Sequence, residues 1–119
     1  ICVFLMYQAS SDSCYNQFYD FYIENYEHPN NCQRFVTAED IQKALDVIEV
    51  KYDVIDFYYH HKIDGEDRDL LEVYLKKCIL NSSVDVLSLF KEKILEYFKP
   101  ETNQFSFKQK TNLIIFQKP

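Results

Sequence analysis

The stretch that decides the fold is residues 41–60, which read IQKALDVIEVKYDVIDFYYH. Its apolar residues recur in steps of three and four, at Ile41, Leu45, Ile48, Tyr52, Ile55 and Tyr59. A polar series follows the same rhythm one residue later, at Asp46, Glu49, Asp53, Asp56 and His60. This spacing is typical of an amphipathic helix, so it predicts one long helix with an apolar stripe beside an acidic stripe.

The start and the end of this helix also have sequence signals. Residues 37–40 (TAED) have the form of a capping box, so Thr37 is expected to cap the helix. The helix is predicted to run to about His61 and to break at Gly65, which would permit a left-handed turn. Ile48 and Ile55 lie in the middle of the apolar stripe. Replacing either with alanine is therefore predicted to cost about 2–5 kcal/mol, as buried large-to-small changes do.

Three further helices are predicted, over about 13–26, 66–80 and 84–98. The tail then changes period, because residues 105–107 alternate and residues 113–116 form a short apolar run. These two segments predict strands joined by a polar turn around 110–112, and the opening run 1–7 could pair with them. The predicted fold class is mainly α: a compact bundle of about four helices, with short β-strands at the N- and C-terminal ends as an addition.

The length of 119 residues suits one helical domain over residues 1–119. Within it, residues 1–11 are expected to be an apolar leader or an edge strand, and residues 100–119 a C-terminal extension. Hydrophobic residues make up 47% of the chain, which is enough for a core. The single glycine excludes the glycine-rich turns that hold dinucleotides or nucleoside triphosphates.

The charge is uneven along the chain. Residues 10–75 carry 15 acidic and 5 basic side chains, whereas residues 76–119 carry 4 and 8. An acidic body repels phosphate backbones, so nucleic acid is not expected as a partner. No apolar run is long enough to span a bilayer, so a stable membrane span is not expected either.

The four cysteines are widely spread, at Cys2, Cys14, Cys32 and Cys78. They form no C-x-x-C pair, which disfavours zinc-ribbon and thioredoxin chemistry. An even number is compatible with two disulfides in a secreted protein, and Cys14–Cys32 and Cys32–Cys78 are two of the possible pairings. The alternative is that these side chains are buried thiols of an intracellular or organellar protein.

Two groups of residues are candidates for a site. Asp53, Asp56 and His60 would share one helix face, which would allow them to bind a divalent metal ion, although a solvated acidic face explains them more simply. The expectation is accordingly no metal, no cofactor and no catalytic residue. The helix over 13–26 carries more aromatic residues than can all face inward. Its partner-binding candidates are Tyr15, Tyr19, Tyr22 and Tyr26.

These observations predict a non-enzymatic protein-binding module, namely a small, acidic, secreted helical protein of cytokine-like or host-directed effector type. The partner is expected to be a protein, with no prediction of its identity or of the oligomeric state. One alternative is a structural accessory subunit of a larger intracellular assembly, such as an organellar complex, since apolar ends and a basic tail suit that role too. A weaker alternative is a carrier of a small apolar ligand.

Overall fold

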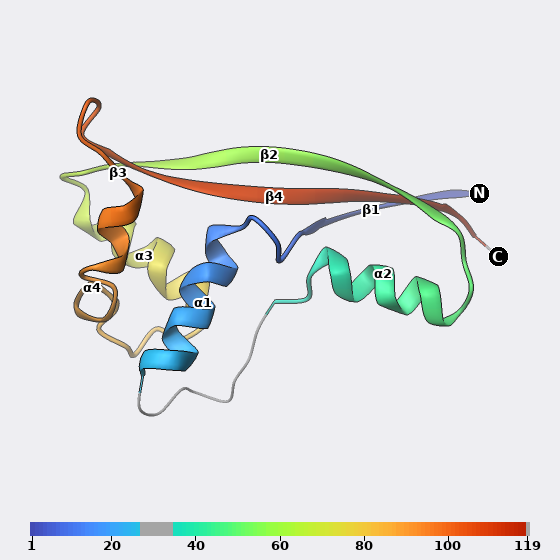
Figure 1. The fold of residues 1–119 in the computed structure, drawn as a ribbon, viewed down its shortest axis with the longest axis horizontal. Helices are drawn as coiled ribbons and strands as arrows, with labels where there is room; N and C mark the ends of the chain where they lie inside the picture. The colour runs from blue at the N-terminus through green and yellow to red at the C-terminus, as the bar shows by residue number, and fades with distance from the viewer. Residues whose placement is uncertain (27–34, 119) are drawn as a thin grey trace. The chain divides into compact units, whose positions relative to one another are not determined.

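The chain has a mixed α/β fold with a four-stranded antiparallel sheet, which overturns the predicted four-helix bundle. The computed structural model describes residues 1–26 and 35–118. Its elements in chain order are β1 (Cys2–Gln8), α1 (Cys14–Asn25), α2 (Ala38–Val47), β2 (Tyr52–Asp64), α3 (Arg68–Ile79), α4 (Val86–Leu89), the 3₁₀ helix η1 (Lys93–Tyr97), β3 (Phe98–Lys99) and β4 (Gln104–Gln117) (Figure 1). The strand order is β1-β4-β2, and β3 also pairs with β4.

The predicted long helix is wrong in its second half. Helix α2 ends at Val47, and residues 52–64 form strand β2. A step of four is an even number, so residues four apart, such as Ile55 and Tyr59, share a face in a strand as well as in a helix. The segment is also rich in Val, Ile, Phe and Tyr, which favour strands.

Both ends of α2 have clear local causes. The capping box at its start is confirmed, because the Thr37 hydroxyl accepts from the Asp40 N–H and the Asp40 carboxylate accepts from the Thr37 N–H. At its end the Glu49 N–H donates to the Asp46 carbonyl and the Val50 N–H donates to the Leu45 carbonyl. These two bonds form a Schellman motif, in which glycine usually occupies the left-handed position. Glu49 occupies it in this chain, with a φ of 60°.

The motif predicts the effect of a glycine at this position. Glu49→Gly should raise the free energy of unfolding by about 0.5–1 kcal/mol, because glycine adopts positive φ without the steric cost that Glu49 bears. Ala44→Gly, in the exposed interior of α2, is the control and should lower it by about 1 kcal/mol. Urea titrations followed by circular dichroism measure both values. Equal losses for the two variants would mean that the helix continues through Glu49.

The chain forms two compact units. Unit 1 is made of Ile1–Ser13, Phe35–Tyr59 and Lys108–Pro119, and unit 2 of Cys14–Arg34 and His60–Phe107. Residue 119 of unit 1 and residues 27–34 of unit 2 lie outside the described part of the chain. The strands β2 and β4 contribute residues to both units. The prediction of one domain over residues 1–119 is not tested by this division and stays a prediction.

In unit 1, helix α2 packs on one face of the sheet that β1 and β4 form (Figure 1). The core of this unit consists of Ala9, Ala38, Leu45 and Ile114. The Glu39 carboxylate ties the helix to the end of β1, because it accepts from the Ser10 N–H at 2.7 Å and the Ser11 N–H at 3.2 Å. Partial burial acts to raise the pKa of Glu39, but these hydrogen bonds outweigh it and the pKa is lowered.

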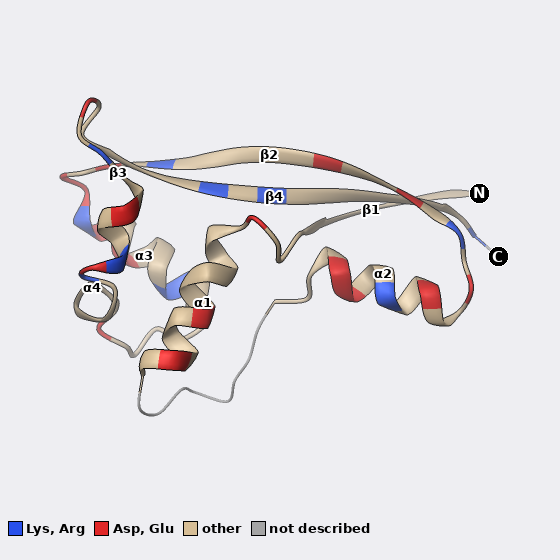
Figure 2. Ribbon diagram, viewed as in Figure 1, with Lys and Arg blue, Asp and Glu red and all other residues tan. Residues whose placement is uncertain are grey.

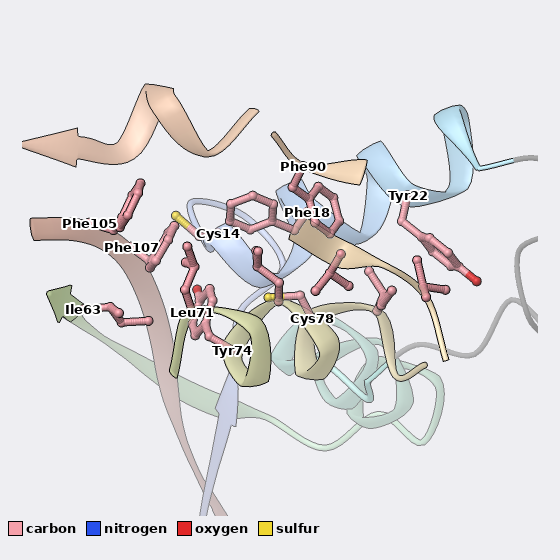
Figure 3. Packing of buried hydrophobic residues seen from close by; sticks show 14 residues of the cluster. Cys14, Phe18, Tyr22, Ile63, Leu71, Tyr74, Cys78, Phe90, Phe105 and Phe107 are labelled. Atoms are coloured by element: carbon pink, nitrogen blue, oxygen red, sulfur yellow. The ribbon is translucent and has the colours of Figure 1, made fainter. Parts of the chain in front are cut away.

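In unit 2, helices α1 and α3 pack together around an aromatic core (Figure 3). Phe18 of α1 is fully buried, and its ring lies 5.0 Å from that of Phe90 and 5.6 Å from that of Phe107, centroid to centroid. Tyr74 of α3 stacks on Phe107 at 4.4 Å. The predicted helices over 13–26 and 66–80 are confirmed by α1 and α3, whose apolar faces supply this core.

Two predictions about the last third of the chain need correction. The helix predicted over 84–98 is replaced by the short helices α4 and η1 and by strand β3. The turn predicted around 110–112 is absent, since β4 continues through these residues and pairs there with β1, with Thr111 opposite Gln8. The polar Asn112 is tolerated within this strand because its side-chain amide has a hydrogen-bond acceptor: it donates to the Asp56 carboxylate at 2.5 Å. The expected pairing of the opening run with the tail is confirmed.

Gly65 has a different role from the predicted one, since no described glycine has a positive φ. Its N–H donates to the Asn103 carbonyl at 2.8 Å. A Cβ atom at Gly65 would lie 2.6 Å from Asn103 Oδ1 and 3.0 Å from the Asn103 carbonyl oxygen. Glycine is required because the two chain segments approach closely, not because of a left-handed turn.

The expectation of disulfides is contradicted, because none joins the cysteines that the structure describes. Cys14 and Cys78 are buried in the core of unit 2, and Cys2 is exposed. Burial raises the pKa of the Cys78 thiol well above its usual value, which keeps the thiol protonated. Cys32 lies outside the described residues, and both named pairings involve it.

In the ranges 1–26 and 35–118, no helix combines the length and the apolar character that a bilayer-spanning helix needs.

Candidate functional site

The sheet of unit 1 has two faces of different character. Residues directly opposite each other in antiparallel strands share a face, and neighbours along a strand alternate. Leu5 of β1 pairs with Ile114 of β4, and both lie on the face that α2 covers. Phe4 pairs with Ile115 and therefore lies on the other face, as does Met6. The side chain of Phe4 is 62% exposed and that of Met6 is 60% exposed.

Strand β2 adds three residues to the same uncovered face. The Asp56 carboxylate accepts from Asn112, which is two residues from Ile114 and so lies on the covered side. Alternation then places Ile55, Phe57 and Tyr59 on the uncovered side, and all three are more than one third exposed. We call this surface the open face; it consists of Phe4, Met6, Ile55, Phe57, Tyr59, Leu113 and Ile115.

The charges of this sheet gather on the side opposite the open face. Figure 2 shows basic positions along β4. The Nζ atoms of Lys108 and Lys110 on this strand lie 4.8 and 5.9 Å from the centroid of the Tyr58 ring. Lys110 also lies 3.8 Å from the Asp56 carboxylate. At the positions that the described strands of unit 1 direct toward the open face, Asp53 is the only charged residue. The open face is therefore nearly uncharged, and the polar residues Gln8 and Thr111 bound its apolar part at one end and Gln117 at the other.

The three metal-ligand candidates do not form a common site. They lie on strand β2, where Asp53 and Asp56 point to opposite faces because they are three residues apart. The shared helix face that motivated the hypothesis, with His60 as its third ligand, is absent. Across the residues that the structure describes, no group of three or more His, Cys, Asp or Glu side chains is arranged to hold a metal ion.

The four candidate tyrosines belong to the packing of unit 2 more than to its surface. Tyr22 is buried, and its hydroxyl accepts from the Asn81 amide at 3.3 Å. Tyr15, Tyr19 and Tyr26 are half-buried. Tyr15 stacks on Tyr74 at 5.2 Å and Tyr26 stacks on Tyr22 at 5.3 Å. Their role in partner binding stays a prediction, and the apolar surface that the sequence did not reveal is the open face.

The comparisons with known proteins place the chain in no family: no family model matches it, and no curated protein has a matching sequence.

Proposed function

We propose that this chain is a non-enzymatic protein-binding module that binds its partner through the open face. The observation that carries the proposal is the exposure of Phe4 and Met6 of β1 on the same face as the exposed Phe57 and Tyr59 of β2, with the half-buried Leu113 and Ile115 of β4 between them. Contiguous apolar patches of this kind are rare on proteins that work alone, and they mark interaction surfaces. A cytokine-like helical bundle is no longer part of the proposal, because the binding surface belongs to a sheet.

The chemistry of the open face defines the kind of partner. An apolar sheet face packs well against a second sheet or against the apolar stripe of a helix, at a layer spacing of about 10 Å for two sheets. The flanking strands β1 and β2 end the strand order β1-β4-β2, so each has an edge that no other strand of the described part of the chain pairs with. Exposed aromatic side chains on a surface with few charges are a composition that protein interfaces favour. The partner is therefore proposed to be a protein with an apolar sheet or helix face.

Photocrosslinking with native material tests the location of the surface. p-Benzoylphenylalanine is placed at Phe4 or Phe57, both exposed and aromatic, and at Leu95 of η1 as an exposed apolar control in unit 2. The expected result is a partner adduct from positions 4 and 57 and none from position 95. The recovered partner is then purified and its affinity measured.

The affinity measurement decides the proposal. Phe57→Asp should weaken binding at least about tenfold, because it buries an unpaired charge in the interface, while Leu95→Asp should leave binding unchanged. Both variants should keep the thermal unfolding profile, since neither side chain is part of a core. Adducts from position 95 alone, or equal affinity for Phe57→Asp and the unmodified chain, would contradict the proposal.

A further inference from the structure

Unit 2 contains a cavity of about 250 Å³ that the proposed function does not use. Helix α3 provides one of its walls, because Leu70, Val73, Tyr74 and Lys77 recur at the spacing of a single helix face. The other walls come from α1 and β2, which contribute Tyr15, His61, Lys62 and Ile63. The cavity volume lies just below the range of about 300–1,000 Å³ that is typical of drug-sized ligands, so it suits a ligand with a single ring or a short branched chain.

The cavity has both buried and exposed apolar lining residues. Ile63 and Tyr74 belong to the buried core of unit 2 (Figure 3), whereas Val73 is 55% exposed. Tyr15, His61 and Tyr74 form a three-ring cluster, in which the ring centroids are 5.2–5.9 Å apart. Both faces of the Tyr74 ring are covered, by Tyr15 and by Phe107. The exposed branched side chains of Leu70 and Val73 therefore supply the contact area for an apolar group.

The polar groups of the cavity are the hydroxyls of Tyr15 and Tyr74, the His61 imidazole and the ammonium groups of Lys62 and Lys77. The Tyr15 hydroxyl lies 3.4 Å from His61 Nε2. The pKa of His61 is lowered, first by burial and then by the positive charge of Lys77, so His61 is neutral at pH 7 and the Lys77 ammonium acts on the same space. Within the described ranges neither Lys62 nor Lys77 forms an ion pair, whereas the adjacent Lys76 pairs with Glu72 at 2.8 Å. No acidic side chain lines the cavity.

From this combination we infer that the cavity binds a small carboxylate with an apolar body, such as an arylacetate, with the ring against Leu70 and Val73 and the carboxylate toward Lys77 and Tyr15. The apolar body and the carboxylate of the ligand bind to different parts of the cavity. The walls provide contact area for the body, and a cation with a hydroxyl provides a charge-assisted site for the anion. This role is independent of the open face, which belongs to unit 1.

The test is an NMR titration of the ¹⁵N-labelled full chain with phenylacetate at pH 7. Saturable shift changes are expected for amides of α3 and β2 around the cavity. The titrating groups that face His61 are Tyr15, Tyr74, Lys62 and Lys77, and the added carboxylate should raise the pKa of His61 because it offsets the Lys77 charge. Phenylacetamide, which has the same shape without the charge, and acetate, which lacks the ring, should each bind at least about tenfold more weakly.

Two matched variants locate the anion site. Lys77→Met should weaken phenylacetate binding about tenfold or more, while Lys76→Met, one residue earlier on α3, should leave it unchanged. Both side chains are at the surface, so the amide spectrum of each variant should retain the pattern of unit 2. Equal binding of phenylacetamide and phenylacetate, equal effects of the two lysine variants, or no saturation up to about 10 mM would each overturn the inference.

Discussion

Phe18→Ala is expected to lower the free energy of unfolding by about 3–5 kcal/mol, the range for a fully buried phenylalanine. The ring of Phe18 has no exposed surface and contacts rings from several other elements: Phe90, Tyr97, Phe107 and Tyr74. Removing it leaves a cavity where these elements meet. Because rings from several elements surround this cavity, a shift of one element alone cannot refill it.

Tyr19→Ala is the matched control, because it removes the next aromatic residue on the same helix. Tyr19 is half-buried and lies 6.4 Å from Tyr22, centroid to centroid. Removing the Tyr19 ring should lower the free energy of unfolding by less than about 2 kcal/mol. Urea unfolding monitored by near- and far-ultraviolet circular dichroism measures both variants. A cost for Tyr19→Ala as large as that for Phe18→Ala would show that the helix is rotated relative to the structure.

The second large effect is expected in unit 1, where Ile114→Ala should cost about 2–5 kcal/mol. Ile114 is fully buried between α2 and the sheet, where it joins Ala38 and Leu45. Ile48→Ala is the informative comparison, because the helical stripe predicts the same large cost for it. In the structure Ile48 is 63% exposed at the end of α2, so its replacement should cost less than about 1 kcal/mol.

The two variants are compared by urea titration under the same conditions. Their ranking decides between the two descriptions of residues 41–60. A larger decrease in the free energy of unfolding for Ile48→Ala than for Ile114→Ala would support the long helix with its buried apolar stripe. The expected order supports a short helix followed by a strand.

The sequence allowed the prediction of elements whose signals are local. Thr37 and Asp40 define the start of α2 because both halves of a capping box lie within four residues. The apolar spacing in α1 and α3 correctly predicted two helices, since each buries one continuous face. The opening run and the tail were correctly expected to pair.

Three other features could not be predicted from the spacing of apolar residues: the end of α2, the strand β2 and the open face. The end of α2 was hidden because Glu49 takes the left-handed position where a glycine would have marked it. The strand β2 was not predicted because a spacing of four between apolar residues places them on one face of a strand as well as of a helix. The open face could not be predicted because it depends on register: only the pairing of Phe4 with Ile115 and of Leu5 with Ile114 shows which side α2 leaves uncovered.

Within the described residues no strand pairs with the outer edge of β2, and this edge affects how readily the chain associates with itself. This strand has 13 residues, ends the strand order of the sheet, and carries exposed apolar side chains on both of its faces. A long unpaired edge is a template onto which another extended chain can add, and proteins usually block such edges with charges or prolines. β2 contains no proline, and its charged residues are Asp53, Asp56, Lys62 and Asp64. The edge of β2 can therefore pair with the same edge of a second copy, so self-association should increase with the concentration of the chain.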